Sequence, residues 1–409
     1  MTQIAQGWGA GPSERYETIA ARFRPIFDDI AKDANRRELE RDLPFDAIKR
    51  LKEAGFGAVR LPREHGGQGA TLPEFFNLLI ELSAADSNIT QALRAHFGFT
   101  EDILNSKSAE RQKVWFERIG RGEIVGSAWT EIGNGAGLDR FSTHVSGDDG
   151  SLVLNGAKYY TTGSLYADWI DVGASDAKGE GIAVAVRRHA EGVDVVDDWD
   201  GFGQVLTASG TTTFTNVKVT ENDIVLDDNR FKYGAAFYQL VHLATLAGIG
   251  RAITNDVTKA VAERTRTYTH AAGPRSSQDP QVLQVVGRIR GGAYSSSAIV
   301  LQAAASIQRA FDTRFIDDPE LEEKANVIAE LETAQAQTVI SDLILQASTI
   351  LFDALGASAT KKPNGLDRHW RNARTLSSHN PRIYKDRIIG DFAVNGTPPP
   401  YQWRIGTPA

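Results

Sequence analysis

The chain has 409 residues, of which 41% are hydrophobic and 24% are charged, a composition typical of globular proteins that excludes disordered and fibrous classes. Lys and Arg number 45 against 52 Asp and Glu, and the resulting net charge of −7 disfavours nucleic-acid binding. Cysteine is absent, which excludes disulfides, thiolate nucleophiles, iron–sulfur clusters and thiolate zinc sites. The first 16 residues lack a signal-peptide core, and two uncharged runs, 233–250 and 291–308, are too polar to span a membrane. We therefore expect a soluble, cytoplasmic protein.

Residues 1–125 have a helical pattern and are expected to form an N-terminal α-helical domain. Apolar residues in the first segment recur at spacings of three and four, as on one face of an amphipathic helix. These residues are Ile19, Phe23, Ile26, Phe27 and Ile30. A second helix is predicted over residues 72–85, with Pro73 in the first turn, where proline is tolerated.

Residues 126–228 change to short apolar runs and are expected to form a central β domain. Residues 152–156 resemble a strand that enters a hairpin turn at Asn155-Gly156. Further strands are predicted at 169–172, 182–186 and 193–196, and as a Thr- and Val-rich pair at 211–215 and 217–219. Strands this close together, without helical patterns between them, indicate a small antiparallel domain.

Residues 229–409 return to helical spacing and are expected to form a C-terminal bundle. Helices are predicted over 256–268, 281–311 and 321–355, with Gly356 ending the last. Long helices joined by short loops are typical of bundles. The predicted fold class is α+β, with helices, a β domain and a helical bundle in that order.

No familiar catalytic motif accompanies this order. Gly248-Ile249-Gly250 lies inside a helical pattern, and residues 133–137 (GNGAG) precede the β domain, so neither is a dinucleotide fingerprint. No two histidines have the i, i+4 spacing that places two metal ligands on one helix face. The eight are His65, His96, His144, His189, His242, His270, His369 and His379. Catalysis would therefore need an organic cofactor or simple acid–base groups.

Four segments resemble motifs of the acyl-CoA dehydrogenase superfamily, in the same order along nearly the whole chain. They are residues 61–69 (LPREHGGQG), Trp129-Thr130-Glu131 with Gly137-Leu138-Asp139, residues 154–162 (LNGAKYYTT) and residues 214–219 (FTNVKV). The resemblance implies that family's fold, an N-terminal helical domain, a small antiparallel β domain and a C-terminal four-helix bundle, assembled as a homotetramer. Apolar residues on the helices from 281 to 355 favour the same assembly.

The resemblance also implies a flavin between the β domain and the bundle. It assigns Ser127, Thr130 and Thr162 to flavin binding, with the Thr162 hydroxyl near flavin N5. Trp129 and Trp199 would line the substrate pocket. A hydroxyl suits a flavin because it can donate or accept a hydrogen bond as the redox state changes. From propensity alone, Thr162 would be an ordinary strand threonine.

The chain departs from the dehydrogenases where their catalytic glutamate should be. That position falls at about Asn380, beside His379, and residues 222–262 contain no glutamate that could replace it. Leu138 and Ile132 also differ from the family's Gly-Ser-Asp and Thr-Glu-Pro motifs. A dehydrogenase without its base is not expected to work.

The segments 367–374 (DRHWRNAR) and 378–381 (SHNP) instead resemble the flavin-dependent monooxygenases of this superfamily, among them the dibenzothiophene monooxygenase group. This resemblance implies that a separate reductase supplies reduced FMN, with FAD as the alternative. O₂ and a flavin C4a-(hydro)peroxide would then oxygenate a small organic substrate at sulfur, nitrogen or an aromatic ring.

Such chemistry needs a group that manages a proton, and histidine titrates in the right range. His379 is the first candidate by motif position. His96, in residues 94–99 (RAHFGF), resembles a histidine that reaches the flavin in these oxygenases, or is a core histidine bonded to backbone. Arg266 and Arg275 would hold flavin phosphate, or lie on the surface. Two other interpretations stay open: an FAD-dependent acyl-CoA dehydrogenase or oxidase with another base, and a non-enzymatic helical assembly protein.

Overall fold

The computed structural model describes residues 2–132, 141–148, 151–226 and 231–401. Two expectations lie outside these residues: the glycine run at 133–137 and the replacement at Leu138.

The N-terminal part is helical, as the spacing predicts. Its helices are α1 (Tyr16–Glu40), α2 (Phe45–Glu53), α3 (Leu72–Ala85), α4 (Ser87–Ala92), α5 (Arg94–Asn105) and α6 (Ala109–Gly120). The predicted helix at 72–85 is confirmed at both ends. Thr71 caps α3 in a capping box with Glu74, and Pro73 lies in the first turn, where its missing N–H is not needed.

One eight-stranded sheet follows. Its strands are β1 (Val125–Ala128), β2 (His144–Ser146), β3 (Val153–Lys158), β4 (Trp169–Ser175), β5 (Gly181–Arg187), β6 (Val193–Val195), β7 (Thr212–Lys218) and β8 (Ile224–Leu226). Their order is β6-β7-β3-β2-β4-β5-β8, with β1 beside β4. Most pairings are antiparallel, as expected, but β1 and β2 both pair with β4 in parallel.

Two strand predictions were wrong in detail. Asn155-Gly156 is not a hairpin turn, because β3 continues to Lys158 and shifts register against β7 between Leu154 and Gly156. Gly156 has φ +148°, and a glycine inside a strand often marks such a bulge. The Thr- and Val-rich pair is one strand, β7, since Asn216 between the two runs stays in the strand with φ +50°.

The C-terminal part consists of α7 (Gly234–Glu263), α8 (Pro280–Thr313), α9 (Pro319–Leu355), α10 (Asp367–His379) and α11 (Lys385–Asn395). The predicted helix at 256–268 was misplaced, since α7 starts at Gly234 and ends at Glu263. Residues 239–250 are buried all round the helix, and such a segment lacks the polar face that gives a helical pattern. The other two long helices, and the end of α9 at Gly356, are confirmed.

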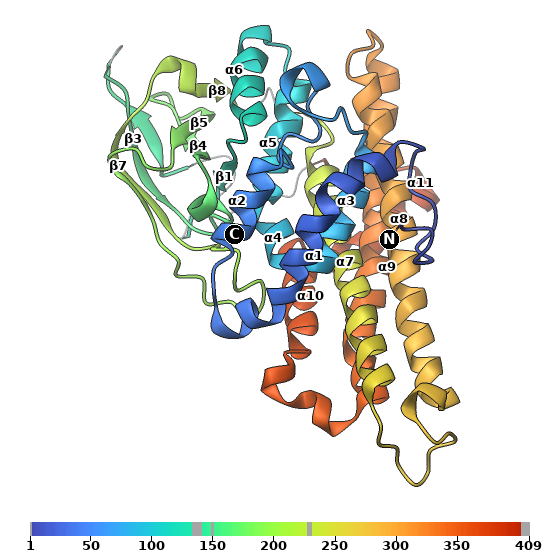
Figure 1. Ribbon diagram of the computed structural model, residues 1–409. Coiled ribbons are helices and arrows are strands. Elements are labelled where there is room, and N and C mark those ends of the chain that lie inside the picture. The colour runs from blue at the N-terminus through green and yellow to red at the C-terminus, as the bar shows by residue number, and fades with distance from the viewer. Residues whose placement is uncertain (1, 133–140, 149–150, 227–230, 402–409) are drawn as a thin grey trace.

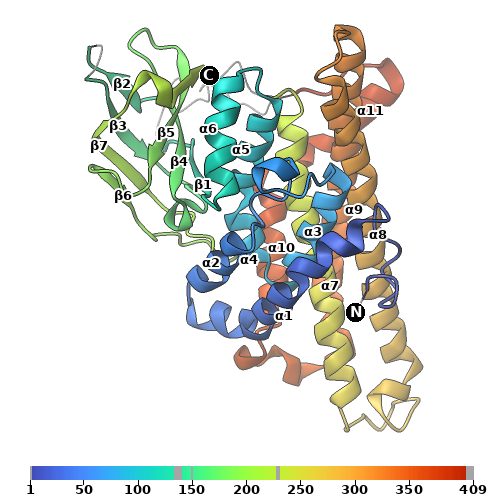
Figure 2. The same ribbon diagram turned by 45° about the horizontal axis from the view of Figure 1, so that its top comes forward.

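The N-terminal helices lie between the sheet and the long helices α7, α8 and α9 (Figures 1 and 2). The two helical parts share one hydrophobic core, in which the rings of Phe75 on α3 and Phe237 on α7 stack with centroids 6.1 Å apart. The sheet has a separate core built around Leu154, Val172 and Val184. A third cluster, in which Phe99 of α5 and Trp115 of α6 pack with Trp169 of β4, joins the sheet to the N-terminal helices.

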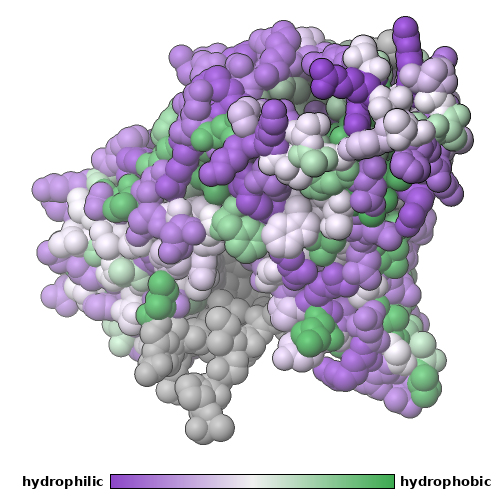
Figure 3. Space-filling view, turned by 90° about the horizontal axis from the view of Figure 1, so that it is seen from below, coloured by the Kyte–Doolittle hydropathy of each residue, from purple (hydrophilic) through white to green (hydrophobic). Residues whose placement is uncertain are grey.

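Among the described residues, α9 is the one helix long and apolar enough to cross a membrane by length and composition. Its buried side chains belong to the helical core, where α9 packs against α7, α8 and α10. Polar residues cover most of the face seen from below, and the apolar ones are scattered between them (Figure 3).

Candidate active site

Four of the expected site residues come together where β1 and β3 end. Ser127 is in β1, and Trp129 and Thr130 follow it. The N–H of Tyr159, just past β3, donates to the carbonyl of Thr130 at 2.8 Å, and Thr162 follows three residues later. Ser127, Trp129, Thr130 and Thr162 are all half-buried, as side chains that border a ligand would be.

A buried ion pair fixes this edge of the sheet. Lys158 Nζ lies 2.7 Å from Glu131 Oε1 and 3.2 Å from the carbonyl of Trp129. Glu131 also accepts hydrogen bonds from the N–H groups of Ser142 and Thr143. These donors hold the pKa of Glu131 down to about 2 against the effect of burial. The Trp-Thr-Glu segment is therefore anchored by its glutamate, and the hydroxyl and indole beside it keep fixed positions.

Thr162 begins a chain of three hydroxyl groups. Its Oγ1 lies 2.7 Å from Ser209 Oγ, and Ser209 Oγ lies 2.7 Å from Thr207 Oγ1. Thr207 Oγ1 then donates to the carbonyl of Gln204 at 2.8 Å.

The direction of every hydrogen bond in this chain is fixed by counting hydrogens. A carbonyl cannot donate, so Thr207 donates its hydroxyl hydrogen to the carbonyl of Gln204. Ser209 must then donate to Thr207, and Thr162 must donate to Ser209. The other contact of Thr162, at 3.4 Å from the carbonyl of Tyr160, would consume the same hydrogen. Thr162 therefore has lone pairs but no hydrogen to offer a ligand.

The backbone around this chain is strained. Of the five described non-glycine residues with positive φ, three flank it: Tyr160 at +57°, Gln204 at +54° and Ala208 at +48°. Such conformations cost on the order of 1 kcal/mol or more each, persist where the surroundings enforce them, and cluster at functional sites. The sequence 204–209 thus folds into a tight loop that aims Ser209 at Thr162.

The same loop ties the sheet to α10. The N–H of Gln204 donates to Asn372 Oδ1 at 2.6 Å, and Arg371 Nη1 donates to the carbonyl of Phe202 at 3.0 Å. Trp199 precedes the loop, and its Nε1 donates to the carbonyl of Gly203 at 3.1 Å. Its ring centroid lies 6.0 Å from that of Tyr160. The hydroxyl chain and Trp199 are therefore connected to the helix that carries His379.

His379 is the last residue of α10 and is exposed. Its Nδ1 lies 3.2 Å from Asn380 Oδ1, and its ring centroid lies 4.4 Å from that of His242 on α7. The surrounding protein and the charge of Arg94 both lower the pKa of His379. At neutral pH it is therefore an uncharged imidazole, the form that could take up a proton in the expected role.

His96 is engaged by the backbone at both ring nitrogens. Nε2 lies 3.0 Å from the carbonyl of Gly57, and Nδ1 accepts from the N–H of Val125 at 3.3 Å. A carbonyl needs a donor, so Nε2 carries the hydrogen and Nδ1 the lone pair. His96 is buried at 1% exposure, and a Cβ on Gly57 would lie 2.5 Å from its ring. This geometry joins α5 to the start of β1 and leaves no nitrogen free for proton transfer.

Burial also lowers the pKa of His96 to about 4. The unfolded chain takes up a proton near pH 6.5 and the folded chain does not until about pH 4, so stability is lost as pH falls through this window. We expect the free energy of unfolding to fall by about 1.4 kcal/mol per pH unit from this histidine alone. Denaturant titrations between pH 7.5 and 4.5 measure it. His96→Gln, whose amide does not titrate, is expected to be less stable at pH 7.5 with a flatter pH profile, and equal slopes would contradict this.

Arg266 and Arg275 are not brought to this site. Both are exposed on the loop between α7 and α8, at the end of the bundle remote from the sheet (Figures 1 and 2). Their contacts among the described residues are made by backbone carbonyls.

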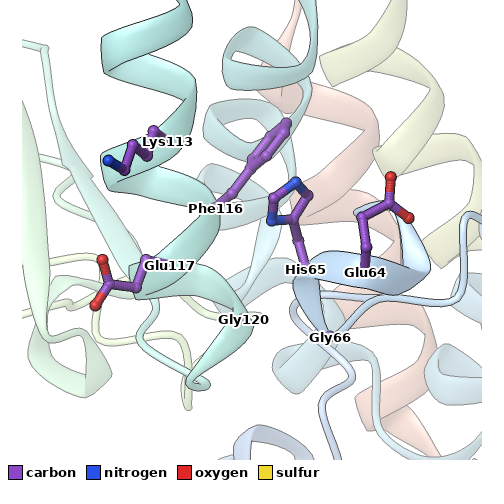
Figure 4. A pocket seen from close by; sticks show the side chains of 7 residues that line it. All are labelled: Glu64, His65, Gly66, Lys113, Phe116, Glu117 and Gly120. Atoms are coloured by element: carbon purple, nitrogen blue, oxygen red, sulfur yellow. The ribbon is translucent and has the colours of Figure 1, made fainter.

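A surface hollow lies between the segment Arg63–His65 and α6, apart from the candidate site (Figure 4). The rings of His65 and Phe116, which help to line it, lie against each other with centroids 4.8 Å apart. None of the expected site residues lines it. No group of three or more His, Cys, Asp or Glu among the described residues is arranged to hold a metal ion.

Sequence reasoning missed Thr207 and Ser209, which complete the hydroxyl chain, and Arg94 and His242, which lie near His379. Arg94 was visible in the segment that also contains His96, two residues away. The polar residues in the otherwise apolar run 239–250 were the signal for His242, since a buried polar side chain needs a partner.

Comparison with known proteins covers most of the chain. The families described as acyl-CoA dehydrogenase N-terminal, middle and C-terminal domains match residues 13–123, 126–217 and 240–381. Dibenzothiophene monooxygenase of Rhodococcus qingshengii is 28% identical over 366 residues, 85% of this chain and 86% of its own. A protein of Pseudomonas putida named "Probable FMNH2-dependent monooxygenase" is 26% identical over 92% of this chain and 94% of its own.

Among solved structures, the methanesulfinate monooxygenase of Pseudomonas fluorescens superposes with a TM-score of 0.82 at 26% identity. The match covers 94% of this chain and 98% of that one. The N-terminal helices, the sheet and the bundle are thus all shared.

Proposed function

The chain belongs to the acyl-CoA dehydrogenase superfamily, and we propose that it is a monooxygenase that uses reduced FMN and O₂ to oxygenate a small organic substrate. A separate flavin reductase supplies the reduced FMN. Sulfur or an aromatic ring is the oxygenated centre, as the names of the relatives suggest.

The direction of the hydroxyl chain carries this proposal. Thr162 offers only lone pairs, because its hydrogen is donated to Ser209. Reduced flavin carries a hydrogen on N5, which such an oxygen can accept, whereas oxidised flavin has a lone pair there, which it would repel. A Thr162 hydroxyl near N5 therefore favours reduced flavin, the form that an oxygenase supplied by a reductase must bind.

The position of the missing glutamate supports the same conclusion. Asn380 Nδ2 donates to Gln239 Oε1 at 2.7 Å, so this position holds a fixed amide rather than a base. His379 beside it can take and return a proton. The base of acyl-CoA dehydrogenases is a glutamate, however, so a histidine here does not indicate a dehydrogenase.

Each residue has a defined task in this proposal. When bound, the flavin supplies the two electrons that activate O₂. Thr162 would accept a hydrogen bond from the N5–H of the reduced flavin, and Ser127 and Thr130 would also help to hold the flavin. His379 holds and returns a proton at the oxygen being transferred. Trp129 and Trp199 exclude water from the reacting centre.

The proposal is tested by isotope labelling. Protein, photoreduced FMN and ¹⁸O₂ are mixed with dibenzothiophene or with methanesulfinate, and the product is analysed by mass spectrometry. We expect one ¹⁸O atom in the product. The competing function is tested by adding octanoyl-CoA anaerobically to protein loaded with oxidised FAD. Loss of the oxidised-flavin absorbance there, without ¹⁸O incorporation, would establish a dehydrogenase instead.

We infer that the protein is a cytoplasmic homotetramer. Leu283, Tyr294 and Val339 are exposed on α8 and α9, where a groove lined by Gly291, Gly292 and Leu343 would admit a second copy. In such an assembly, Arg266 and Arg275 would bind flavin phosphate of a neighbouring protomer. We expect a sedimentation mass near four chains of 44.5 kDa. A mass near one chain at micromolar concentration would contradict this.

A further inference from the structure

Arg94, at the start of α5, carries a charge that no carboxylate among the described residues neutralises. Its Nε donates to the carbonyl of Tyr238 at 3.3 Å, and its guanidinium lies over the Tyr238 ring, 4.8 Å from the centroid. Two of the more deeply buried arginines have a carboxylate partner, Arg37 with Asp86 at 2.9 Å and Arg60 with Glu101 at 3.0 Å. The third, Arg251, makes its hydrogen bonds to the neutral side chains of Ser297 and Gln3. Arg94 is half-buried, so removing it from water has a cost that a bound anion would offset.

His242 lies near Arg94 and has no hydrogen-bond partner at either ring nitrogen within the described part of the chain. It is 0% exposed. Leaving a buried donor or acceptor unsatisfied costs about 1–3 kcal/mol, and a neutral imidazole has one of each. Such a residue indicates a partner that the protein itself does not provide.

Arg94 and His242 are brought together by Tyr238 of α7. Tyr238 and His242 are one helical turn apart on α7 and therefore lie on the same face. Gly98 on α5 makes the close approach of Tyr238 possible, since a Cβ there would lie 2.1 Å from the ring. His379 on α10 packs on His242, so three helices meet at this point.

The charges here have one sign. Burial lowers the pKa of His242 and of His379, and the positive charge of Arg94 lowers both pKa values further. Both imidazoles are therefore neutral at pH 7. The cluster then has one fixed positive charge and neutral hydrogen-bonding nitrogens. A guanidinium binds two oxygens of one group in parallel, which matches an oxyanion with a single negative charge.

We propose that Arg94 and His242 form an anion-binding end of the substrate site, next to His379, and that the substrate is a small organic oxyanion such as a sulfinate or a carboxylate. That the bound anion is the substrate rests on the proposed function, whereas anion binding itself does not depend on turnover.

The test is equilibrium binding without turnover. The affinities of benzenesulfinate, methanesulfinate and benzoate, and of neutral methyl phenyl sulfone, are measured by calorimetry on the wild type and on Arg94→Gln. We expect the best anion to bind about tenfold or more weakly to Arg94→Gln, whereas the sulfone binds both proteins alike. Arg118→Gln is the matched control, because Arg118 is also half-buried and stacked on aromatic rings, those of Trp115 and Trp169. This control should leave anion binding unchanged.

His242→Phe provides a second readout. It removes both unsatisfied nitrogens, so we expect the midpoint of thermal unfolding to rise while anion binding weakens. A merely structural histidine would change stability and leave anion binding unchanged, which would remove His242 from the site.

Three outcomes would overturn the proposal: no saturable binding of any of the three anions, equal anion affinity in wild type and Arg94→Gln, or a loss of reduced-FMN affinity alone in Arg94→Gln. The last outcome would assign Arg94 to the flavin. Failure of ¹⁸O incorporation with intact anion binding would instead overturn the proposed function and leave the anion site standing.

Discussion

Replacing His379 by alanine is expected to lower product formation by roughly 10²–10⁴, the usual range for loss of a general acid–base group. The imidazole ends α10 with an exposed ring, and its described contacts are those with Asn380 and His242, so the fold should survive. Oxygen consumption should continue, with electrons diverted to hydrogen peroxide. The measurement is the ratio of product to hydrogen peroxide at matched supply of reduced FMN.

His189→Ala is the control for this experiment, because His189 is exposed in the turn between β5 and β6 and contacts Arg188. It should leave the ratio unchanged. An unchanged ratio in His379→Ala would remove His379 from the mechanism. His96 would then need a conformation in which it leaves Gly57 and Val125, since both of its nitrogens are occupied.

Replacing Thr162 by valine is expected to lower the yield of product per reduced FMN by roughly 5- to 150-fold, because one hydrogen bond of about 1–3 kcal/mol is lost at the flavin. The swap preserves shape, so stability should change much less. Ser209→Ala removes the acceptor at 2.7 Å and leaves the Thr162 hydrogen only its longer contact, 3.4 Å from the carbonyl of Tyr160, so it should impair coupling and weaken the preference for reduced flavin less than Thr162→Val does.

Thr215→Val on the exposed side of β7 is the control for both variants. Product yield and hydrogen peroxide release are measured together with thermal unfolding. If Thr162→Val oxidises reduced FMN with wild-type coupling, Thr162 is only a strand residue.

The sequence motifs predicted the parts of the candidate site that belong to continuous segments. Trp129, Thr130 and Thr162 could be proposed because they lie at fixed offsets from the ends of β1 and β3, and His379 because it ends the segment that forms α10. The hydroxyl chain could not be found, since Ser209 reaches Thr162 across 47 residues through backbone conformations that Gln204 and Ala208 rarely adopt. Nothing in a local pattern encodes such a contact.

The same limit applied to the helices. Those with one polar face, such as α8, were predicted to within two residues of their ends. The first half of α7 is buried all round, so the sequence pattern did not predict where α7 starts. The position of His242 on α7, next to α10, was therefore not predicted either. His96 was predictable as an important residue, but only the geometry distinguishes its two backbone hydrogen bonds from a free catalytic nitrogen.

The measurement that tests the central claim most directly is the anaerobic affinity for reduced FMN compared with oxidised FMN, in the wild type and in Thr162→Val. Because Thr162 can only accept, reduced FMN is expected to bind about tenfold or more tightly than oxidised FMN, and the ratio should fall toward one in the variant. Equal affinities in the wild type, or tighter binding of oxidised FMN, would contradict the account.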